Sequence, residues 1–128
     1  MTSKRSKLSR TLAAVAITAC SLFSASSTVA AQAGAPAAWE CGEWSFCIYS
    51  GAGGTGSRLE MRDGVYDLGG VGGGVLDNNV HSVKNISGDA WCLYDYMGYE
   101  GLLTRIQDSY TGPISASIGE KVTSVQAC

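Results

Sequence analysis

Hydrophobic and polar residues alternate with a period of two at several places in this chain. Leu59 and Met61 flank a glutamate, and Ile114, Ala116 and Ile118 are separated by serines. Such alternation is typical of a β-strand with one buried face. No segment beyond residue 33 repeats apolar residues at the i, i+3, i+4, i+7 spacing of an amphipathic helix. The pattern therefore predicts short strands and almost no helix.

Turn-forming residues separate the expected strands from one another. The chain has 17 glycines, and all of them lie beyond residue 33. Glycine at this frequency, with aromatic residues between, indicates tight turns joining short strands. The strands are expected at 45–50, 57–62, 65–68, 80–86, 91–95, 102–106, 109–116 and 121–126.

The chain also contains an internal duplication. Residues 46–49 (FCIY) align with 91–94 (WCLY), and residues 78–85 (NNVHSVKN) align with 120–127 (EKVTSVQA). Each unit then spans about 40 residues and four expected strands, a size that fits one Greek key. Two such units are expected to pack as two sheets.

The fold class predicted is all-β, an eight-stranded β-sandwich made of two Greek keys. The domain is expected at 45–128, with the first Greek key at about 45–86 and the second at about 91–128. A short segment, 34–44, precedes it.

The second unit carries a recognisable motif. Tyr94, Tyr99 and Gly101, with Ser124 downstream, resemble the βγ-crystallin Greek-key signature of aromatic, four residues, aromatic, one residue and glycine, followed later by serine. The resemblance implies a folded hairpin whose glycine adopts a conformation closed to other residues. It also implies that the serine satisfies hairpin backbone groups and that the aromatic rings cover the base of the hairpin.

The first unit matches the same signature less fully. Tyr49, Gly56 and Ser82 stand at the expected positions, but Gly54 replaces the second aromatic residue. The stretch from Gly51 to Gly56 also fits the G-x-G-x-x-G pattern of nucleotide-binding loops. That pattern requires a following helix, whereas a strand is expected here. The glycines are therefore interpreted as the hairpin of the first Greek key.

The start of the chain is typical of a secretory signal. Four basic residues lie within the first ten, and an apolar stretch, 12–23, ends in small residues. Cleavage is expected after Ala33 or Ala31, so 1–33 is assigned as a cleaved leader and the protein as secreted. As an alternative, 17–20 resembles a bacterial lipobox, in which Cys20 would be lipidated and anchor the protein to a membrane.

Four cysteines remain beyond the leader: Cys41, Cys47, Cys92 and Cys128. An even number in a small exported chain indicates two disulfides, for which three pairings exist. The pairing favoured is Cys41 with Cys47, closing a small loop, and Cys92 with Cys128, attaching the last residue to an interior strand. Each bridge is expected to stabilise the fold by roughly 2–4 kcal/mol.

The charge of the exported part excludes several partners. Beyond residue 33 there are five basic and eleven acidic residues, a net charge of −6. Nucleic acids and anionic membranes need clustered lysine and arginine. We therefore expect an acidic, soluble monomer that binds neither, unless Cys20 carries a lipid.

The first unit supports a narrower resemblance. Residues 41–56 (CGEWSFCIYSGAGGTG) resemble the opening of the secreted actinobacterial peptidase inhibitors of the Streptomyces metalloproteinase-inhibitor type, which have a crystallin-like fold. The shared features are a short Cys–Cys loop, a Cys-x-Tyr strand and a Gly-x-Gly hairpin. The Cys–Cys loop is one residue longer than expected, and no segment matches that family's reactive bond.

This resemblance implies a secreted peptidase inhibitor, acting on metalloproteases through a rigid exposed loop, with the target protease as its partner. The candidate inhibitory loop is Asp95, Tyr96, Met97 and Gly98, because its aromatic and methionine side chains offer anchors. The alternative is that these residues only complete the hairpin. The protein would then be a non-inhibitory extracellular crystallin-type module that binds calcium, is structural or resembles a killer toxin.

The sequence offers little for catalysis, so an enzyme is not expected. The single histidine, His81, lies in an expected strand, where a packing role is more common. The acid pairs Glu60/Asp63 and Glu40/Glu43 have no spacing that fixes them across a cleft. The glycine run 68–75 lacks the Gly-Lys-Ser/Thr ending of a phosphate loop and is expected to be a flexible crossover.

Calcium is the one cofactor considered. Asn78, Asn79 and Ser82 resemble the βγ-crystallin calcium motif, in which oxygen atoms converge on the ion. Val83 replaces the final serine of that motif, and Lys121 places an ammonium group in the corresponding loop of the second unit. The alternative is that the two asparagines form a turn.

Overall fold

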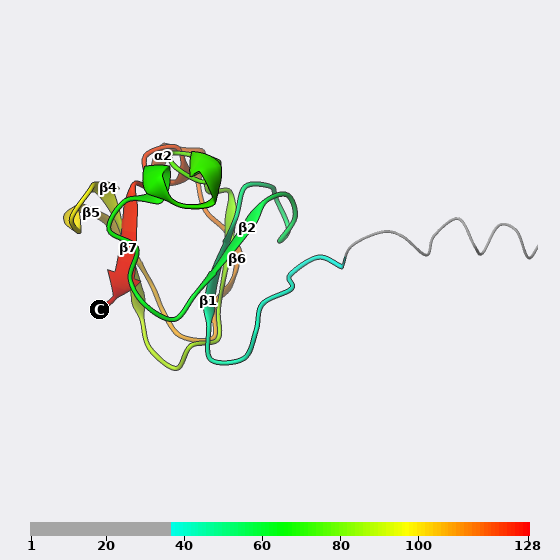
Figure 1. Ribbon diagram of the computed structural model, residues 1–128. Helices are drawn as coiled ribbons and strands as arrows, with labels where there is room; N and C mark the ends of the chain where they lie inside the picture. The colour runs from blue at the N-terminus through cyan, green and yellow to red at the C-terminus, as the bar shows by residue number, and fades with distance from the viewer. Residues whose placement is uncertain (1–36) are drawn as a thin grey trace, which may run out of the picture. The chain divides into compact units, whose positions relative to one another are not determined.

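Two antiparallel sheets form the core of residues 37–128, the part of the chain that the computed structural model describes (Figure 1). The expected leader 1–33, its cleavage sites and Cys20 lie outside the described residues.

One sheet has the strand order β2-β1-β3-β6 and the other β5-β4-β7. The strands of the first sheet are β1 (Phe46–Tyr49), β2 (Arg58–Met61), β3 (Ser82–Asn85) and β6 (Thr111–Pro113). Those of the second sheet are β4 (Trp91–Tyr96), β5 (Glu100–Ile106) and β7 (Ser124–Ala127). The all-β sandwich expected from the sequence is thus confirmed.

The two repeats exchange their third strands. β6 belongs to the second repeat but pairs with β3 of the first, with Val83 opposite Gly112. In return, Val65 of the first repeat forms a bridge with Val125 of β7, in the other sheet. Each sheet is therefore completed by the other repeat.

The strand expected at 65–68 is reduced to that single bridge. A 3-10 helix, η1 (Leu68–Gly70), begins where the strand was expected to end, because the carboxylate of Asp67 accepts the N–H of Gly69 at 2.9 Å. A second 3-10 helix, η2 (Gly72–Gly74), follows. The glycine run 68–75, expected to be a flexible crossover, contains these two hydrogen-bonded turns.

The strand expected at 109–116 was too long. β6 ends at Pro113, and a short helix, α2, spans Ala116–Gly119. Ile114 and Ile118 both pack against the core, but residues four apart share a face in a helix as well as in a strand. Ala116, which a strand would place on that same face, is exposed. The alternation of apolar residues at 114–118 therefore fits both a strand and a helix, and the structure has a helix at 116–119.

The core lies between the two sheets. Phe46 and Trp91 occupy equivalent positions of the two repeats, and their rings stack with centroids 4.8 Å apart. Both are buried, as are Ile48 and Leu93, the equivalent aliphatic residues two positions later. The duplication seen in the sequence thus becomes a pseudo-symmetric core.

Both expected disulfides are confirmed. Cys41 is bonded to Cys47, six residues later, and Cys92 is bonded to Cys128, 36 residues later. The first bridge attaches the N-terminal segment to β1, and the second attaches the last residue to β4.

Candidate functional site

The two Greek-key hairpins share one backbone conformation. Each contains three residues with a left-handed backbone at matching positions. In the first hairpin these are Gly53, Gly54 and Gly56, with φ of 66°, 72° and 80°, and in the second Gly98, Tyr99 and Gly101, with φ of 76°, 65° and 73°. The hairpins therefore differ in the side chains they carry rather than in shape.

One buried serine holds each hairpin. The hydroxyl of Ser82 donates to the carbonyl of Gly51 at 2.7 Å and accepts the N–H of Gly54 at 2.9 Å. The hydroxyl of Ser124 donates to the carbonyl of Tyr96 at 2.5 Å and accepts the N–H of Tyr99 at 3.0 Å. These two bonds from each serine hold the turn of its hairpin closed.

The first hairpin is covered by Trp39 from the N-terminal segment. The N–H of Trp39 donates to the carbonyl of Gly54 at 3.0 Å, and its ring meets that of Tyr49 edge-on at 5.6 Å. A Cβ added at Gly54 would lie 2.4 Å from the indole. Glycine replaces the second aromatic residue in this repeat because Trp39 supplies the ring instead.

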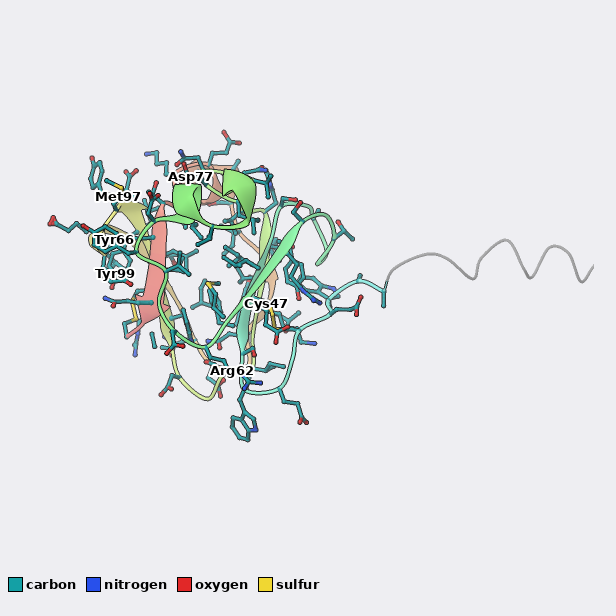
Figure 2. All side chains as sticks on the ribbon, in the orientation of Figure 1. Cys47, Arg62, Tyr66, Asp77, Met97 and Tyr99 are labelled. Carbon is teal, nitrogen blue, oxygen red and sulfur yellow. A yellow bond between two sulfur atoms is a disulfide. The ribbon has the colours of Figure 1, made fainter. Side chains whose placement is uncertain are left out.

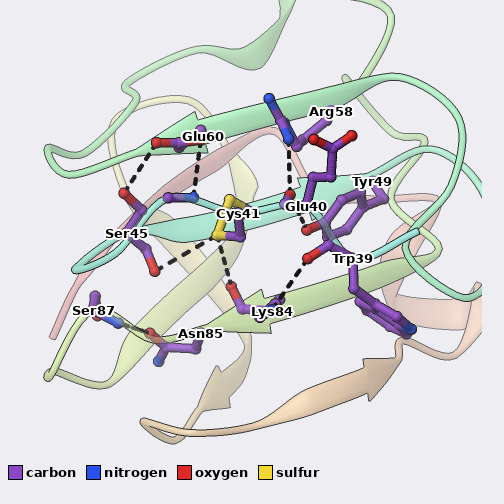
Figure 3. Close-up of a disulfide and its surroundings, with 12 residues drawn as sticks. Trp39, Glu40, Cys41, Ser45, Tyr49, Arg58, Glu60, Lys84, Asn85 and Ser87 are labelled. Atoms are coloured by element: carbon purple, nitrogen blue, oxygen red, sulfur yellow. Dashed lines mark hydrogen bonds between the residues drawn. A yellow bond between two sulfur atoms is a disulfide. The ribbon is translucent and has the colours of Figure 1, made fainter. Parts of the chain in front are cut away.

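Three of the five lysine and arginine side chains in residues 37–128 hold that N-terminal segment, and all three donate to its backbone carbonyls. Arg58 donates to Glu40 at 3.0 Å, Lys84 to Trp39 at 3.1 Å and Arg62 to Glu43 at 3.0 Å. Figure 3 shows the first two of these bonds beside the Cys41–Cys47 disulfide. Residues 39–43 are therefore integrated into the folded unit.

The second hairpin, in contrast, displays large apolar side chains. Tyr96 and Met97 are 64% and 54% exposed, and Tyr66, from the loop after β2, is 61% exposed beside them. Figure 2 shows Met97, Tyr66 and Tyr99 gathered at one end of the β4–β5 ribbon. We call Tyr66, Tyr96 and Met97 the apolar tip. Clustered exposed apolar residues of this kind mark interaction surfaces.

Several contacts make the tip rigid. The N–H of Gly98 donates to the carbonyl of Tyr66 at 3.1 Å, and the rings of Tyr66 and Tyr99 meet edge-on at 5.9 Å. Tyr96 lies over Gly101, where an added Cβ would be 2.8 Å from the ring. The Cys92–Cys128 disulfide attaches the strand that leads into the turn.

Tyr66 was not identified from the sequence. It lies 30 residues before Tyr96 in the chain and reaches the tip only because Val65 crosses to the second sheet. The sequence shows Tyr66 as an aromatic residue in the turn-rich stretch DGVYDLGG, but nothing there indicates that it lies beside Tyr96 and Met97. Of the expected loop residues, the structure places Tyr96, Met97 and Gly98 at the tip and Asp95, half-buried, at the end of β4.

The three residues considered for calcium have different partners. The hydroxyl of Ser82 is engaged by the first hairpin, and the side-chain amide of Asn79 donates to the carbonyl of Val75 at 2.9 Å. Of the three, only Asn78 is exposed and close to another oxygen atom able to bind calcium. Its side-chain oxygen accepts a hydrogen bond from the hydroxyl of Thr123 at 3.4 Å. Beside it, Asp77 Oδ1 is buried without a hydrogen-bond partner in the described part of the chain.

Asp77 and Thr123 were not among the residues that the sequence singled out as calcium ligands. Asp77 lies directly before the two asparagines, and Thr123 lies 45 residues after Asn78. Only the folded structure brings the Thr123 hydroxyl to Asn78.

Two other titratable side chains, His81 and Glu60, contact backbone or side-chain groups within the fold. His81 Nδ1 lies 2.8 Å from the carbonyl oxygen of Ser50. Glu60 accepts the N–H of Gly42 at 3.1 Å and the hydroxyl of Ser45 at 3.3 Å. Across 37–128, no three His, Cys, Asp or Glu side chains are grouped to hold a metal ion. No helix in that same range is long and apolar enough to cross a membrane.

The hydroxyl of Tyr49 has a shifted pKa. Burial raises the pKa of Tyr49 above its ordinary value of 10.0, and Glu60 and Glu40 act in the same direction, while Arg58 opposes them. The hydroxyl of Tyr49 donates to the carbonyl of Glu40 at 2.6 Å. Ionisation would remove this donor.

Comparison with known proteins identifies both the fold and a family. The model of peptidase inhibitor family I36 matches residues 34–106. The chain matches no curated protein.

Solved βγ-crystallin structures share the fold. A βγ-crystallin from Ciona intestinalis is 21% identical with a TM-score of 0.55, over 66% of this chain and 99% of its own. A domain from Flavobacterium johnsoniae is 23% identical with a TM-score of 0.55, over 65% of this chain and 92% of its own. One from Clostridium beijerinckii is 19% identical with a TM-score of 0.55, over 65% and 95%.

Proposed function

Because the chain belongs to peptidase inhibitor family I36, we propose that it is a secreted inhibitor whose apolar tip enters the cleft of a target peptidase. Family membership and the crystallin-like fold point to a binding protein rather than an enzyme. The two disulfides are consistent with an extracellular location.

The observation that carries the proposal is the contrast between the two hairpins. They share a backbone conformation and a serine bond, but the position of Met97 is occupied by Ala52 in the first hairpin. The first hairpin is covered by Trp39, whereas the second leaves Tyr96, Met97 and Tyr66 exposed. A purely structural hairpin has no need of two exposed apolar side chains, Tyr96 and Met97, beside a third, Tyr66, from another loop.

The tip would bind with little loss of conformational freedom. Ser124 and the Tyr66 carbonyl already hold the turn, so few torsions remain to be ordered on docking. Tyr96 and Met97 offer two apolar anchors for neighbouring pockets of a cleft, and Tyr66 widens the contact.

The tip also indicates which peptidases it suits. The segment 95–100 contains Asp95 and Glu100 but no lysine or arginine. A peptidase whose pocket requires a basic side chain would therefore find no anchor there. We propose a metallopeptidase with an apolar primary pocket, which agrees with the resemblance of residues 41–56 to inhibitors of metalloproteinases.

Inhibition assays test the proposal. The oxidised protein is titrated against a thermolysin-like metallopeptidase, with a chymotrypsin-like serine and a papain-like cysteine peptidase in parallel. We expect inhibition of the metallopeptidase. Tyr96→Ala and Met97→Ala should each raise the inhibition constant about fivefold or more, since buried interface anchors contribute more than about 1 kcal/mol.

Trp44→Gly is the matched control. Trp44 is also an exposed aromatic residue, 70% accessible, but lies in the Cys41–Cys47 loop, so its replacement should leave inhibition unchanged. Inhibition that survives both tip variants would assign the activity to another surface. Lack of inhibition of all three peptidases at micromolar protein would reject the proposed function itself.

Calcium binding is a second candidate function, favoured by the buried, unpartnered Oδ1 of Asp77 beside Asn78. Carboxylate, amide and hydroxyl oxygens from Asp77, Asn78 and Thr123 are suitable ligands for this ion. Titration calorimetry with calcium should show heat and a raised melting temperature, both lost in Asp77→Asn. Absence of heat and of a melting shift at millimolar calcium would exclude this role.

A further inference from the structure

Another exposed aromatic residue, Trp44, lies in a disulfide-closed loop away from the apolar tip. The loop is closed by the Cys41–Cys47 disulfide, and Trp44 is 70% exposed with a left-handed backbone, φ 60°. Glycine or asparagine is the usual residue in that conformation, and a bulky aromatic residue there is strained. An exposed indole held at such a position suggests a recognition role.

Hydrogen bonds hold the backbone on both sides of Trp44. The carboxylate of Glu60 accepts the N–H of Gly42 at 3.1 Å, and the guanidinium of Arg62 donates to the carbonyl of Glu43 at 3.0 Å. The carbonyl of buried Ser45 accepts the N–H of Ile86 at 3.0 Å. Both sides of Trp44 are therefore fixed to neighbouring strands or their extensions.

The indole borders a hollow beside the loop. Glu43, Trp44 and Ile86 line this hollow, whose volume is about 240 Å³. The ring also lies close to Gly88, where an added Cβ would be 3.6 Å away. A hollow of this size is smaller than the roughly 300–1,000 Å³ of small-molecule sites and suits a single side chain.

The acidic side chains near the hollow favour a cation, and the positive charge of Arg62 opposes one. Arg62 donates to the backbone carbonyl of Glu43 and the hydroxyl of Ser45 rather than to the Glu43 carboxylate. Two further acids, Asp89 and Asp108, are exposed in and near the turn that contains Gly88. A positively charged group above the Trp44 ring would be attracted by the ring face and by these carboxylates.

We propose that Glu43, Trp44 and Ile86 form a recognition site for an arginine side chain of a protein partner. The guanidinium stacks on the indole and pairs with the Glu43 carboxylate, while the aliphatic stem lies on Ile86. Arginine fits better than lysine because its planar group can stack and donate sideways at once.

This site is separate from the proposed inhibitory surface. Arg62, which holds the loop, and Met97, at the apolar tip, lie well apart in Figure 2. An arginine bound beside Trp44 is therefore not in the cleft that the tip would enter, and the two proposals fail or succeed independently.

Nuclear magnetic resonance on the ¹⁵N-labelled oxidised protein tests the site. The probe is a blocked Gly-Gly-Arg-Gly-Gly peptide, and the same peptide with citrulline is the uncharged control. We expect the arginine peptide to shift the Trp44 indole and Gly88 amide signals in a saturable way. The citrulline peptide should bind the wild type about twofold to fivefold more weakly than the arginine peptide does. The arginine peptide should bind Glu43→Gln more weakly by the same factor. The effect is small because an exposed charge pair contributes at most about 1 kcal/mol to binding.

Trp44→Gly provides the decisive variant, since glycine adopts the same backbone conformation without strain and the fold should be retained or stabilised. It should abolish the shifts at Gly88, whereas Met97→Ala should leave them intact. The proposal is overturned by no shift at millimolar peptide, by equal binding of citrulline and arginine peptides, or by unchanged binding in Trp44→Gly.

Discussion

At the scale of single residues, Tyr49 shows how burial links a side chain to stability. Its ring is 1% exposed, and its hydroxyl bonds the carbonyl of Glu40 in the N-terminal segment. Burial raises the pKa of this hydroxyl in the folded protein. Below the ordinary pKa the hydroxyl is neutral in both the folded and the unfolded chain, and the folded protein keeps the hydrogen bond to Glu40. As the pH rises beyond it, the unfolded chain loses the proton first, and folding becomes less favourable.

We therefore predict that the free energy of unfolding falls as the pH rises above 10, the ordinary pKa of tyrosine. Tyr49→Phe should cost about 1 kcal/mol at neutral pH through the lost hydrogen bond but should lose less stability between pH 8 and 11. Urea unfolding across that range measures both effects. Tyr96→Phe, at an exposed site, is the control and should follow the wild type. Equal alkaline losses in Tyr49→Phe and the wild type would contradict the prediction.

At the scale of elements, one hairpin backbone is used twice with different covers. In the second repeat, Tyr94 and Tyr99 meet with ring centroids 6.0 Å apart. In the first, Tyr49 instead meets Trp39, which comes from outside the repeat. The N-terminal segment is therefore part of the first Greek key's packing, although it precedes the repeat in the sequence.

Removal of that cover should destabilise the protein. We expect Trp39→Ala to lower the free energy of unfolding by about 2 kcal/mol, less than for a fully buried tryptophan because the side chain is half-buried. Trp44→Ala removes the same side chain from an exposed position and should change stability by no more than about 0.5 kcal/mol. Urea unfolding measures both variants. Equal losses in the free energy of unfolding would contradict the view that Trp39 covers the first hairpin.

At the scale of the whole folded unit, the exchange of third strands joins the repeats. One close approach is between Val80, just before β3, and Gly119, at the end of α2. The N–H of Val80 donates to the carbonyl of Gly119 at 3.0 Å, and a Cβ added at Gly119 would lie 1.7 Å from the Val80 oxygen. The two backbones meet too closely for any side chain.

Gly119→Ala should consequently force these backbones apart and cost about 3 kcal/mol, the upper range for overpacked sites. Gly70→Ala is the matched control, because its added Cβ would have only one ordinary contact, at 3.9 Å. We expect that variant to change stability by less than about 1 kcal/mol, as judged by thermal or urea unfolding. Similar stability of the two variants would contradict the prediction and show that the Val80 and Gly119 backbones can move apart at little cost.

The parts of the fold that were predictable from the sequence have local or repeated signals. The duplication, most of the strands and both hairpins follow from alternation and turn residues between neighbours in the chain. The strands predicted at 65–68 and 109–116 were too long. Asp67 starts a 3-10 helix in the first segment, and the alternation at the end of the second also fits a helix. At the candidate site, Tyr96 and Met97 were found from their own residue types. Tyr66 was not, because only the strand exchange brings it there.

The sequence by itself determined the all-β class, the two Greek keys and the residues able to pair as disulfides. These depend on residue types at short spacings, where steric and hydrophobic preferences act along the chain. Only the tertiary structure decided which hairpin is covered and which is exposed. Trp39 reaches Gly54, and Tyr66 reaches Tyr99, through packing between segments distant in sequence. No local pattern encodes such contacts, because they depend on the burial and hydrogen bonding of the whole folded unit.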